Sequence, residues 1–245
     1  VLDVAEANFL QKHAENSRLG IPLIIGIDAI HGNAMVRGTT VYPAPLAMAS
    51  SWNTELVEQA SIETASEMRA TGSHWTFAPN IDLARDARWG RVGETFGEDT
   101  YLVGEMGVAM VRGLQQGDFS SRNAVVANAK HWVAGGEPLT GINLSPMDVS
   151  LRTLYEDFFP PFKKAIDAGV FTFMAAHNEI NGEPAHGSHF LLTEVLRDNW
   201  KFEGFVVSDW MDVSRLHTFH KVAKTPEDAV FQTVYAGMDL SLIHI

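Results

Sequence analysis

Five short segments of the chain carry the pattern of buried parallel strands. Each is apolar and little interrupted, as is typical of a strand covered on both faces. The segments span residues 21–27, 74–78, 124–129, 171–176 and 205–208. Because strands of this kind need helices to cover them, the pattern predicts helical segments in the intervals.

Helical periodicity is present in these intervals. Asn53 or Thr54 is placed to cap the first helix, and Pro226 falls near the first turn of the last. Pro160 and Pro161 are expected to break the third helix, because proline lacks the N–H that an internal helical position needs. The apolar positions that define the helices are Val57, Ala60, Ala65 and Met68, then Leu102, Met106, Ala109 and Met110, then Leu151, Leu154, Tyr155 and Phe158, then Leu191, Leu192, Val195 and Leu196, and last Val230, Thr233 and Val234.

Strand and helix therefore alternate with long crossovers, which predicts a parallel α/β architecture. The two alternatives are a closed barrel and a doubly wound open sheet. No G-x-G-x-x-G follows any of the strands, and G-x-x-x-x-G-K-[ST] does not occur. The absence of both motifs weakens the nucleotide-binding open-sheet folds.

Composition and charge narrow the possible partners. The chain has 245 residues, 46% of them hydrophobic, which suits one large α/β domain or two small ones. Its net charge of -12 repels phosphate, so neither nucleic acid nor an anionic membrane is an expected partner. The lack of cysteine excludes disulfides and thiolate metal sites. No apolar run approaches the roughly 20 residues of a membrane-spanning helix.

Polar residues capable of chemistry follow the C-terminal end of every expected strand. In a barrel these ends converge on one face, which is where active sites are built. In chain order the residues are Asp28 and His31, then Asn80, Asp82, Arg85, Asp86, Arg88 and Arg91, then Lys130 and His131, then His177 and Asn178, and finally Asp209 and Trp210. Charged side chains are rarely buried without a partner or a purpose, so their recurrence at five strand ends favours a functional pocket over ordinary loop polarity.

The same residues suit the binding of a polyhydroxylated substrate. Asp28 can accept hydrogen bonds from sugar hydroxyls, whereas Arg91, Lys130 and His131 can donate them. Trp210 offers an apolar face to the C–H side of a sugar ring. The predicted ligand is therefore an oligosaccharide or another glycoside, whose neutral charge makes it indifferent to the acidic surface.

Asp209 is the candidate for bond cleavage, because a carboxylate can stabilise an oxocarbenium-like transition state and form a glycosyl intermediate. Three other interpretations remain open. A class I aldolase would use Lys130 as a Schiff base. A metal-dependent hydrolase would use His31, His131, His177 and Asp209, although the H-x-H pairs common in such enzymes are absent. A sugar-binding barrel without catalysis is the third.

Several motifs resemble those of the family 3 glycoside hydrolases of β-glucosidase type, in the same order and with similar spacing. They are GIDAIHG at 26–32, ARDARWGR at 84–91, FGED at 96–99, KH at 130–131 and GFVVSDW at 204–210. The resemblance covers nearly the whole chain, from about Asn16 to Asp239. It implies a (β/α)8 TIM-barrel-like fold in which residues 1–245 form a single partial domain, incomplete at both ends, with residues 241–245 a non-native tail.

The resemblance also implies a role for each site residue. Asp209 matches the nucleophile of a retaining hydrolase that releases terminal, non-reducing β-D-glucosyl or related β-glycosyl residues. The residues that match the positions holding the glycosyl unit are Asp28, Arg91, Lys130 and His131. Trp210 matches an aromatic residue that lines the subsite. His177 stands where many relatives have tyrosine and is expected to bind substrate. No cofactor and no metal are implied.

Other polar residues of these loops are expected to be structural. Arg85 and Arg88 are expected to pair with acidic residues of the same region. The candidate partners are Asp82, Asp86, Glu94 and Asp99, and Glu98 is likewise expected to be structural. Trp132 either lines the pocket or belongs to the core.

The acid/base catalyst is expected outside this chain, in a C-terminal domain of the same polypeptide. The loop at 132–143 lacks the histidine that serves this role in the relatives acting on N-acetylglucosaminides, and Glu137 is a minor candidate within it. The chain alone is therefore expected to hydrolyse aryl β-glucosides barely or not at all. By family analogy, a periplasmic or extracellular location is expected.

Overall fold

Parallel strands follow one another in chain order at the centre of the structure, a computed structural model that describes residues 3–117 and 119–242. The strands are β1 (Gly26–Ile27), β2 (Trp75–Thr76), β3 (Asn128–Trp132), β4 (Thr172–Ala175) and β7 (Phe205–Val207). β1 pairs with β2, and β4 lies between β3 and β7. Bridges from Trp75 to Val126 and from Asn80 to Lys130 join the β2 and β3 segments, and Leu240 bridges to Val207.

Helices occupy the crossovers between these strands. The α-helices are α1 (Val4–Glu15), α2 (Pro45–Ala49), α3 (Thr54–Ala70), α4 (Thr100–Gln115), α5 (Leu151–Thr153), α6 (Phe159–Asp167), α7 (Asp212–Thr218) and α8 (Pro226–Ala236). Leu154–Phe158 and Phe190–Asn199 are π-helical, and Val92–Glu94 and Ala185–Gly187 are 3₁₀-helical. A short hairpin, β5 (Glu179–Ile180) and β6 (Glu183–Pro184), follows β4.

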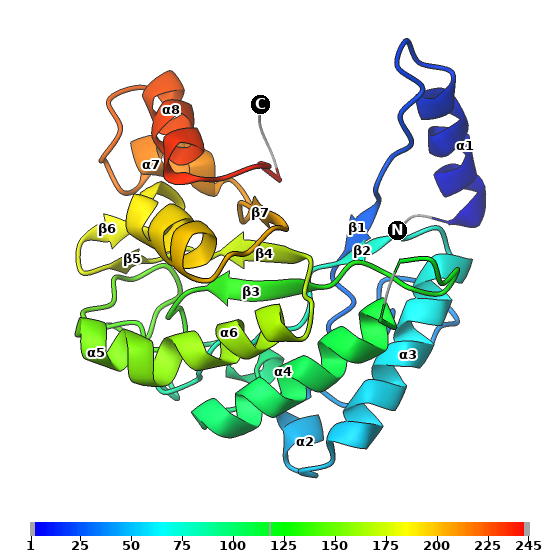
Figure 1. Ribbon diagram of the computed structural model, residues 1–245, viewed down its shortest axis with the longest axis horizontal. Coiled ribbons are helices and arrows are strands. Elements are labelled where there is room, and N and C mark those ends of the chain that lie inside the picture. Colours follow the sequence, from blue (N-terminus) through cyan, green and yellow to red (C-terminus); the bar gives the residue numbers. More distant parts are fainter. Residues whose placement is uncertain (1–2, 118, 243–245) are drawn as a thin grey trace.

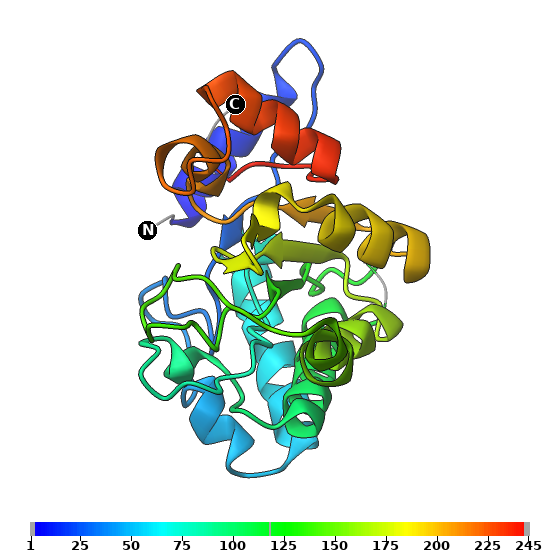
Figure 2. The ribbon, with the colours of Figure 1, turned by 90° about the vertical axis from the view of Figure 1, so that its left-hand side faces the viewer.

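This order of strands is that of a barrel wall. A right-handed crossover places its helix on a fixed side of the sheet, so successive steps in one direction place all the helices on the same face. Figure 1 accordingly shows the helices in chain order around the outside of the strands, from α3 through α4 and α6 to α8. Figure 2 shows the same layers from the side, with α3 and α4 across the strands from α8. The predicted TIM-barrel-like α/β fold is confirmed.

Side-chain caps fix where the longer helices begin. The Asn53 side chain accepts a hydrogen bond from Leu56 N and starts α3, as its position in the sequence predicts. Asp99 caps α4 in the same way, and Thr225 caps α8 directly before Pro226. Gly113 allows α4 to approach α3 closely, since a Cβ there would lie 2.4 Å from Glu58 O.

The core between strands and helices is apolar and rich in aromatic rings. The Trp132 ring packs against Phe159, Phe162, Phe173 and Trp200, with centroids 4.9 to 5.9 Å apart. Trp132 has no exposed surface and therefore belongs to the core, which decides between its two expected positions. Within residues 3–117 and 119–242, the helices are too short or too polar to cross a membrane.

The observed strands lie within or near the expected segments, and two of them differ most. In the segment 21–27, Ile21 and Ile24 are more than 60% exposed, and only Gly26–Ile27 is paired. Hydrophobicity alone predicted burial there, but the segment reaches the sheet only at its end. The third strand was expected at 124–129 and forms at Asn128–Trp132, because its pairing with β4 begins at Asn128.

The expected break at Pro160 and Pro161 is wrong. The chain is helical from Leu151 to Asp167, and the prolines lie in the first turn of α6. The preceding π-helical segment, Leu154–Phe158, changes the hydrogen-bond register of the helix. In the first turn of a helix the N–H groups have no partner within the helix, so proline is tolerated there.

Candidate active site

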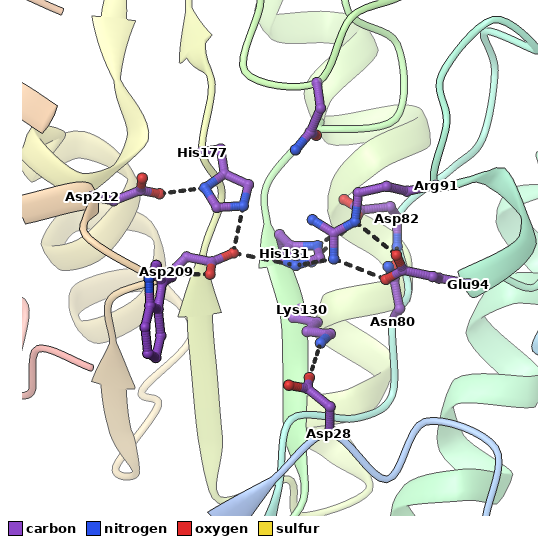
Figure 3. A network of polar contacts seen from close by, with 12 residues as sticks. Asp28, Asn80, Asp82, Arg91, Glu94, Lys130, His131, His177, Asp209 and Asp212 are labelled. Carbon is purple, nitrogen blue, oxygen red and sulfur yellow. Dashed lines mark hydrogen bonds and ion pairs between the residues drawn. The ribbon is translucent and has the colours of Figure 1, made fainter. Parts of the chain in front are cut away.

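A cavity of about 530 Å³ opens at the C-terminal ends of the strands. Its lining residues in the described part of the chain are Asp28, Phe77, Arg91, Glu94, Lys130, His131, Asn143, Met174, His177, Asp209, Trp210, Arg215 and Leu242. All seven predicted site residues are among them, although their sequence positions extend from 28 to 210. Figure 3 shows how the polar members converge from separate strands.

Asp28 and Lys130 form one side of the cavity. Asp28 directly follows β1, and Lys130 lies within β3, on the other side of the β2 segment. Lys130 Nζ lies 3.0 Å from Asp28 Oδ1, and the lysine side chain is 4% exposed whereas the carboxylate is 53% exposed. The pair neutralises a buried ammonium group and leaves carboxylate oxygens facing the cavity, where a sugar hydroxyl can donate to them.

His131 is held by the carboxylate of Asp82. Its Nδ1 lies 2.7 Å from Asp82 Oδ2, and both side chains are almost fully buried. Burial lowers the pKa of His131, and the charge of Arg91 lowers it further, so the ring is neutral at neutral pH. Nδ1–H then donates to Asp82, and Nε2 accepts from Arg91 Nη2 at 3.1 Å.

Arg91 is also paired with Glu94. Arg91 Nη2 lies 2.8 Å from Glu94 Oε2, and Arg91 Nε lies 3.0 Å from Oε1. Burial alone would raise the pKa of Glu94, but the guanidinium of Arg91 holds it below its usual value. Glu94 is therefore ionised and fixes Arg91, which agrees with the structural role expected for it.

Asp209 lies two residues after the end of β7 and points into the cavity (Figure 3). Its Oδ2 lies 2.9 Å from His177 Nε2 and 3.5 Å from His131 Nε2, and its Oδ1 accepts from Trp210 N at 2.6 Å. Burial alone would raise the pKa of Asp209, but the hydrogen bond from His177 and the charge of that ring hold it far below its usual value. Asp209 is thus an ionised carboxylate with two donors that fix its orientation.

Sequence reasoning missed Asp212, which lies behind His177. Asp212 Oδ2 is 2.6 Å from His177 Nδ1, and its side chain is 1% exposed. Met211 adopts a left-handed conformation (φ 64°) that turns the chain sharply after Trp210 and brings Asp212 back beside Asp209. Asp212 could have been recognised in the sequence as a second aspartate, three residues after Asp209 and at the start of a helical pattern.

His177, Asp209 and Asp212 have ligand-type atoms within 4.8 Å of one another. Their closeness follows from hydrogen bonding, because the His177 ring lies between the two carboxylates. Arg215 Nη1 also donates to Asp212 Oδ1 and supplies a positive charge. The group is therefore satisfied as a hydrogen-bonded network without a metal ion.

Other residues lie apart from the cavity. His31 Nδ1 contacts Tyr42 O at 2.9 Å, and His31 does not line the cavity, so it cannot join the histidines that a metal site would need. Glu137 lies 3.7 Å from Arg85 Nε, is 45% exposed in its side chain and also lies outside the lining.

The expected arginine pairs are partly wrong. Arg88 binds Asp86, as expected. Arg85 instead pairs with Asp157, from the π-helical segment before α6. Asp82 binds His131 and has no ion pair with an arginine among the described residues. The arginines were expected to pair with Asp82 because they lie close to it in the sequence. The partner of Asp82 is instead His131, which comes from the neighbouring strand β3.

Comparison with known proteins identifies the family. Residues 4–244 match the family described as glycosyl hydrolase family 3 N terminal domain. The chain belongs to glycosyl hydrolase family 3. Among its relatives in this family, a β-xylosidase of Formosa agariphila is 43% identical over 99% of the chain, and a periplasmic β-glucosidase of Salmonella typhimurium is 41% identical over 92%.

Solved structures of family 3 enzymes share the fold. A β-glucosidase of Listeria innocua in complex with isofagomine superposes with a TM-score of 0.92 over 98% of the chain, at 37% identity. A β-glucosidase involved in saponin metabolism from intestinal bacteria also has a TM-score of 0.92, at 41% identity over 97% of the chain. The chain spans about a third of each of these relatives, between 29% and 35% of their lengths.

Proposed function

We propose that the polypeptide carrying this chain hydrolyses terminal, non-reducing β-D-glucosyl or closely related β-glycosyl residues with retention of anomeric configuration. The observation that carries the proposal is the ionised Asp209 carboxylate, oriented by two donors in a cavity lined with polar groups that can hydrogen-bond to hydroxyls. Relatives that are named β-glucosidase and β-xylosidase, at 41% and 43% identity, support both glucosyl and xylosyl substrates.

Asp209 is proposed to attack the anomeric carbon. The bond from that carbon to the aglycone oxygen breaks as the bond to a carboxylate oxygen of Asp209 forms. Water then displaces Asp209, so the two inversions give net retention. Its low pKa keeps Asp209 ionised and nucleophilic across the neutral range.

The remaining cavity residues are proposed to hold the glycosyl unit. Asp28 accepts from sugar hydroxyls, whereas Lys130, Arg91 and His131 are the basic groups beside it. Trp210, whose surface is 57% exposed, offers its ring face to the sugar. His177 is proposed to donate a hydrogen bond to the nucleophile Asp209 rather than to a hydroxyl of the sugar.

The acid/base is proposed to come from outside the described residues. The carboxylates that line the cavity among these residues are Asp28, Glu94 and Asp209. Glu94 is ionised by Arg91, Asp28 is paired with Lys130 and Asp209 is the nucleophile, so none is suited to donate a proton. A further domain of the same polypeptide and a periplasmic or extracellular location are part of the same proposal.

The geometry weighs against an aldolase. Lys130 Nζ is ion-paired with Asp28 and buried, whereas a Schiff base requires a free amine facing its carbonyl. In a sugar-binding domain without catalysis, no reaction would require the Asp209 carboxylate to be held in one orientation by two donors.

The test is turnover by the full-length polypeptide. Nitrophenyl β-glucoside and β-xyloside should be hydrolysed, and NMR of early product should show the β anomer. The Asp209→Asn variant should fold but lose turnover. Net inversion, or full activity in that variant, would contradict the proposal. Binding of glucose without any turnover would instead support a sugar-binding domain.

A further inference from the structure

Asp212 is a buried carboxylate that does not line the cavity. Its Oδ2 faces His177 Nδ1 at 2.6 Å and His186 Nε2 at 3.6 Å, and its Oδ1 accepts from Arg215 Nη1. Figure 3 shows it on the far side of the His177 ring from Asp209. The carboxylate is contacted on both oxygens, and the His177 ring lies between it and the carboxylate of Asp209.

The position of His177 between two carboxylates determines its protonation. An ionised carboxylate can only accept hydrogen bonds, so a ring nitrogen at hydrogen-bond distance from one must carry a proton. Nδ1 lies 2.6 Å from Asp212 and Nε2 lies 2.9 Å from Asp209. Both nitrogens are therefore protonated, and the ring is an imidazolium.

The charges around His177 agree with this assignment. The titratable or charged groups that face it are Asp209, Asp212, Arg215, His131 and His186. Burial lowers the pKa of both His131 and His186, so they add little positive charge at neutral pH. Burial also lowers the pKa of His177, but the hydrogen bonds to the two carboxylates outweigh it and raise the pKa to about 9.

We propose that Asp212 is a positioning residue for the hydrolytic reaction, which acts by holding His177 as a cation that donates to Asp209. The inference rests on the proposed role of Asp209 as nucleophile. A charge-assisted hydrogen bond is about twice as strong as a neutral one. A tyrosine in place of His177, as the resemblance implies for many relatives, would donate a single neutral bond to Asp209 and leave Asp212 without this partner.

The cation acts mainly on the second step of the reaction. When water attacks the glycosyl intermediate, its oxygen bonds to the anomeric carbon and its proton passes to the acid/base proposed outside the described residues. The bond between the anomeric carbon and the Asp209 oxygen breaks, and its electron pair returns to the carboxylate. His177 Nε2–H lies where that charge develops, so it stabilises Asp209 as a leaving group. Loss of the cation should therefore slow hydrolysis of the intermediate more than its formation.

The test uses the full-length polypeptide and a dinitrophenyl glycoside, whose leaving group needs no proton. The kcat of the unaltered protein should fall only as pH rises through about 9. In Asp212→Asn the fall should begin about two pH units lower, so kcat at pH 8 should be reduced by about 10-fold. Asp198→Asn, the same change at an exposed position, is the control and should leave the profile unchanged.

A double variant separates this role from a structural one. In a His177→Tyr background, the added Asp212→Asn change should alter kcat by less than about 2-fold at any pH, because neighbours that act through one another are not additive. Equal effects of Asp212→Asn in both backgrounds, or an unchanged alkaline limb, would overturn the inference. Thermal unfolding confirms that each variant is folded.

Histidine-selective ¹⁵N NMR tests the same inference without turnover. At pH 8 one imidazolium signal should vanish in His177→Tyr and should become mostly a neutral-ring signal in Asp212→Asn. If the protein hydrolyses no glycoside, the proposed function fails while this spectrum still decides the state of His177. A neutral His177 in the unaltered protein would contradict the inference directly.

Discussion

Asp82 Oδ2 lies 2.7 Å from His131 Nδ1, and the Asp82 side chain has no exposed surface. This contact fixes the ring so that its other nitrogen faces Arg91 and Asp209. In Asp82→Asn the amide can present a donor to Nδ1, which favours the opposite tautomer. We expect kcat/KM for nitrophenyl glucoside to fall by about 10- to 100-fold, and the free energy of unfolding to fall by about 1–3 kcal/mol.

Asp86→Asn is the matched control for that variant. Asp86 lies in the same loop but pairs with Arg88, whose side chain is 65% exposed. Its loss should change kcat/KM by less than about 2-fold, because exposed ion pairs contribute little. Equal losses in the two variants would show that the His131 contact is unimportant.

Lys130→Met should weaken substrate binding without abolishing catalysis. Lys130 Nζ is buried and paired with Asp28, so the variant removes a charged donor from the proposed sugar-binding cavity. We expect kcat/KM to fall by about 10- to 100-fold while products keep the β configuration. Borohydride should trap no covalent adduct with a carbonyl substrate in the unaltered protein. Complete loss of activity together with borohydride trapping at Lys130 would favour the aldolase interpretation.

Gly204→Ala should destabilise the fold. A Cβ at Gly204 would lie 2.0 Å from Phe171 O, so the start of β7 would have to move away from the segment preceding β4. We expect a loss of about 1–3 kcal/mol in the free energy of unfolding, measured by denaturant titration. Gly93→Ala, where a Cβ has no neighbour within 4 Å, should be nearly neutral. Equal stability of the two variants would refute the packing argument.

The charge on His177 should make stability depend on pH. Its pKa is raised from 6.5 to about 9 in the folded protein, so folding favours the protonated ring. This stabilisation is fully present below about 6.5 and is lost as pH rises through about 9. The difference in Tm between the unaltered protein and His177→Phe should therefore be largest at about pH 6 and shrink above pH 9. A difference that grows with pH would reverse the assignment.

The positions of the strand ends could be predicted from the sequence. Several side-chain contacts behind the cavity at those ends could not. Apolar runs followed by polar residues placed Asp28, Lys130 and Asp209 at one end of a parallel sheet, since that pattern depends on local sequence. The same pattern overestimated burial at Ile21, because an apolar residue is buried only where a neighbour covers it.

The network behind the cavity depends on pairing between distant segments. Asp82 meets His131 across neighbouring strands, and Asp212 meets His177 only because Met211 turns the chain back. Neither partner could be chosen from sequence spacing. The π-helical register before Pro160 was likewise invisible, because it depends on packing rather than on helix propensity.

The most direct test of the account is covalent labelling of Asp209. A 2-deoxy-2-fluoro glycoside with a good leaving group should form a slowly hydrolysed intermediate on the full-length polypeptide, because Asp209 is ionised and faces the cavity. Peptide mass spectrometry should place the label on Asp209, and Asp209→Asn should lose label and turnover by on the order of 10⁴–10⁶-fold. A label on Asp28 or Glu94, or turnover that survives in Asp209→Asn, would contradict the account.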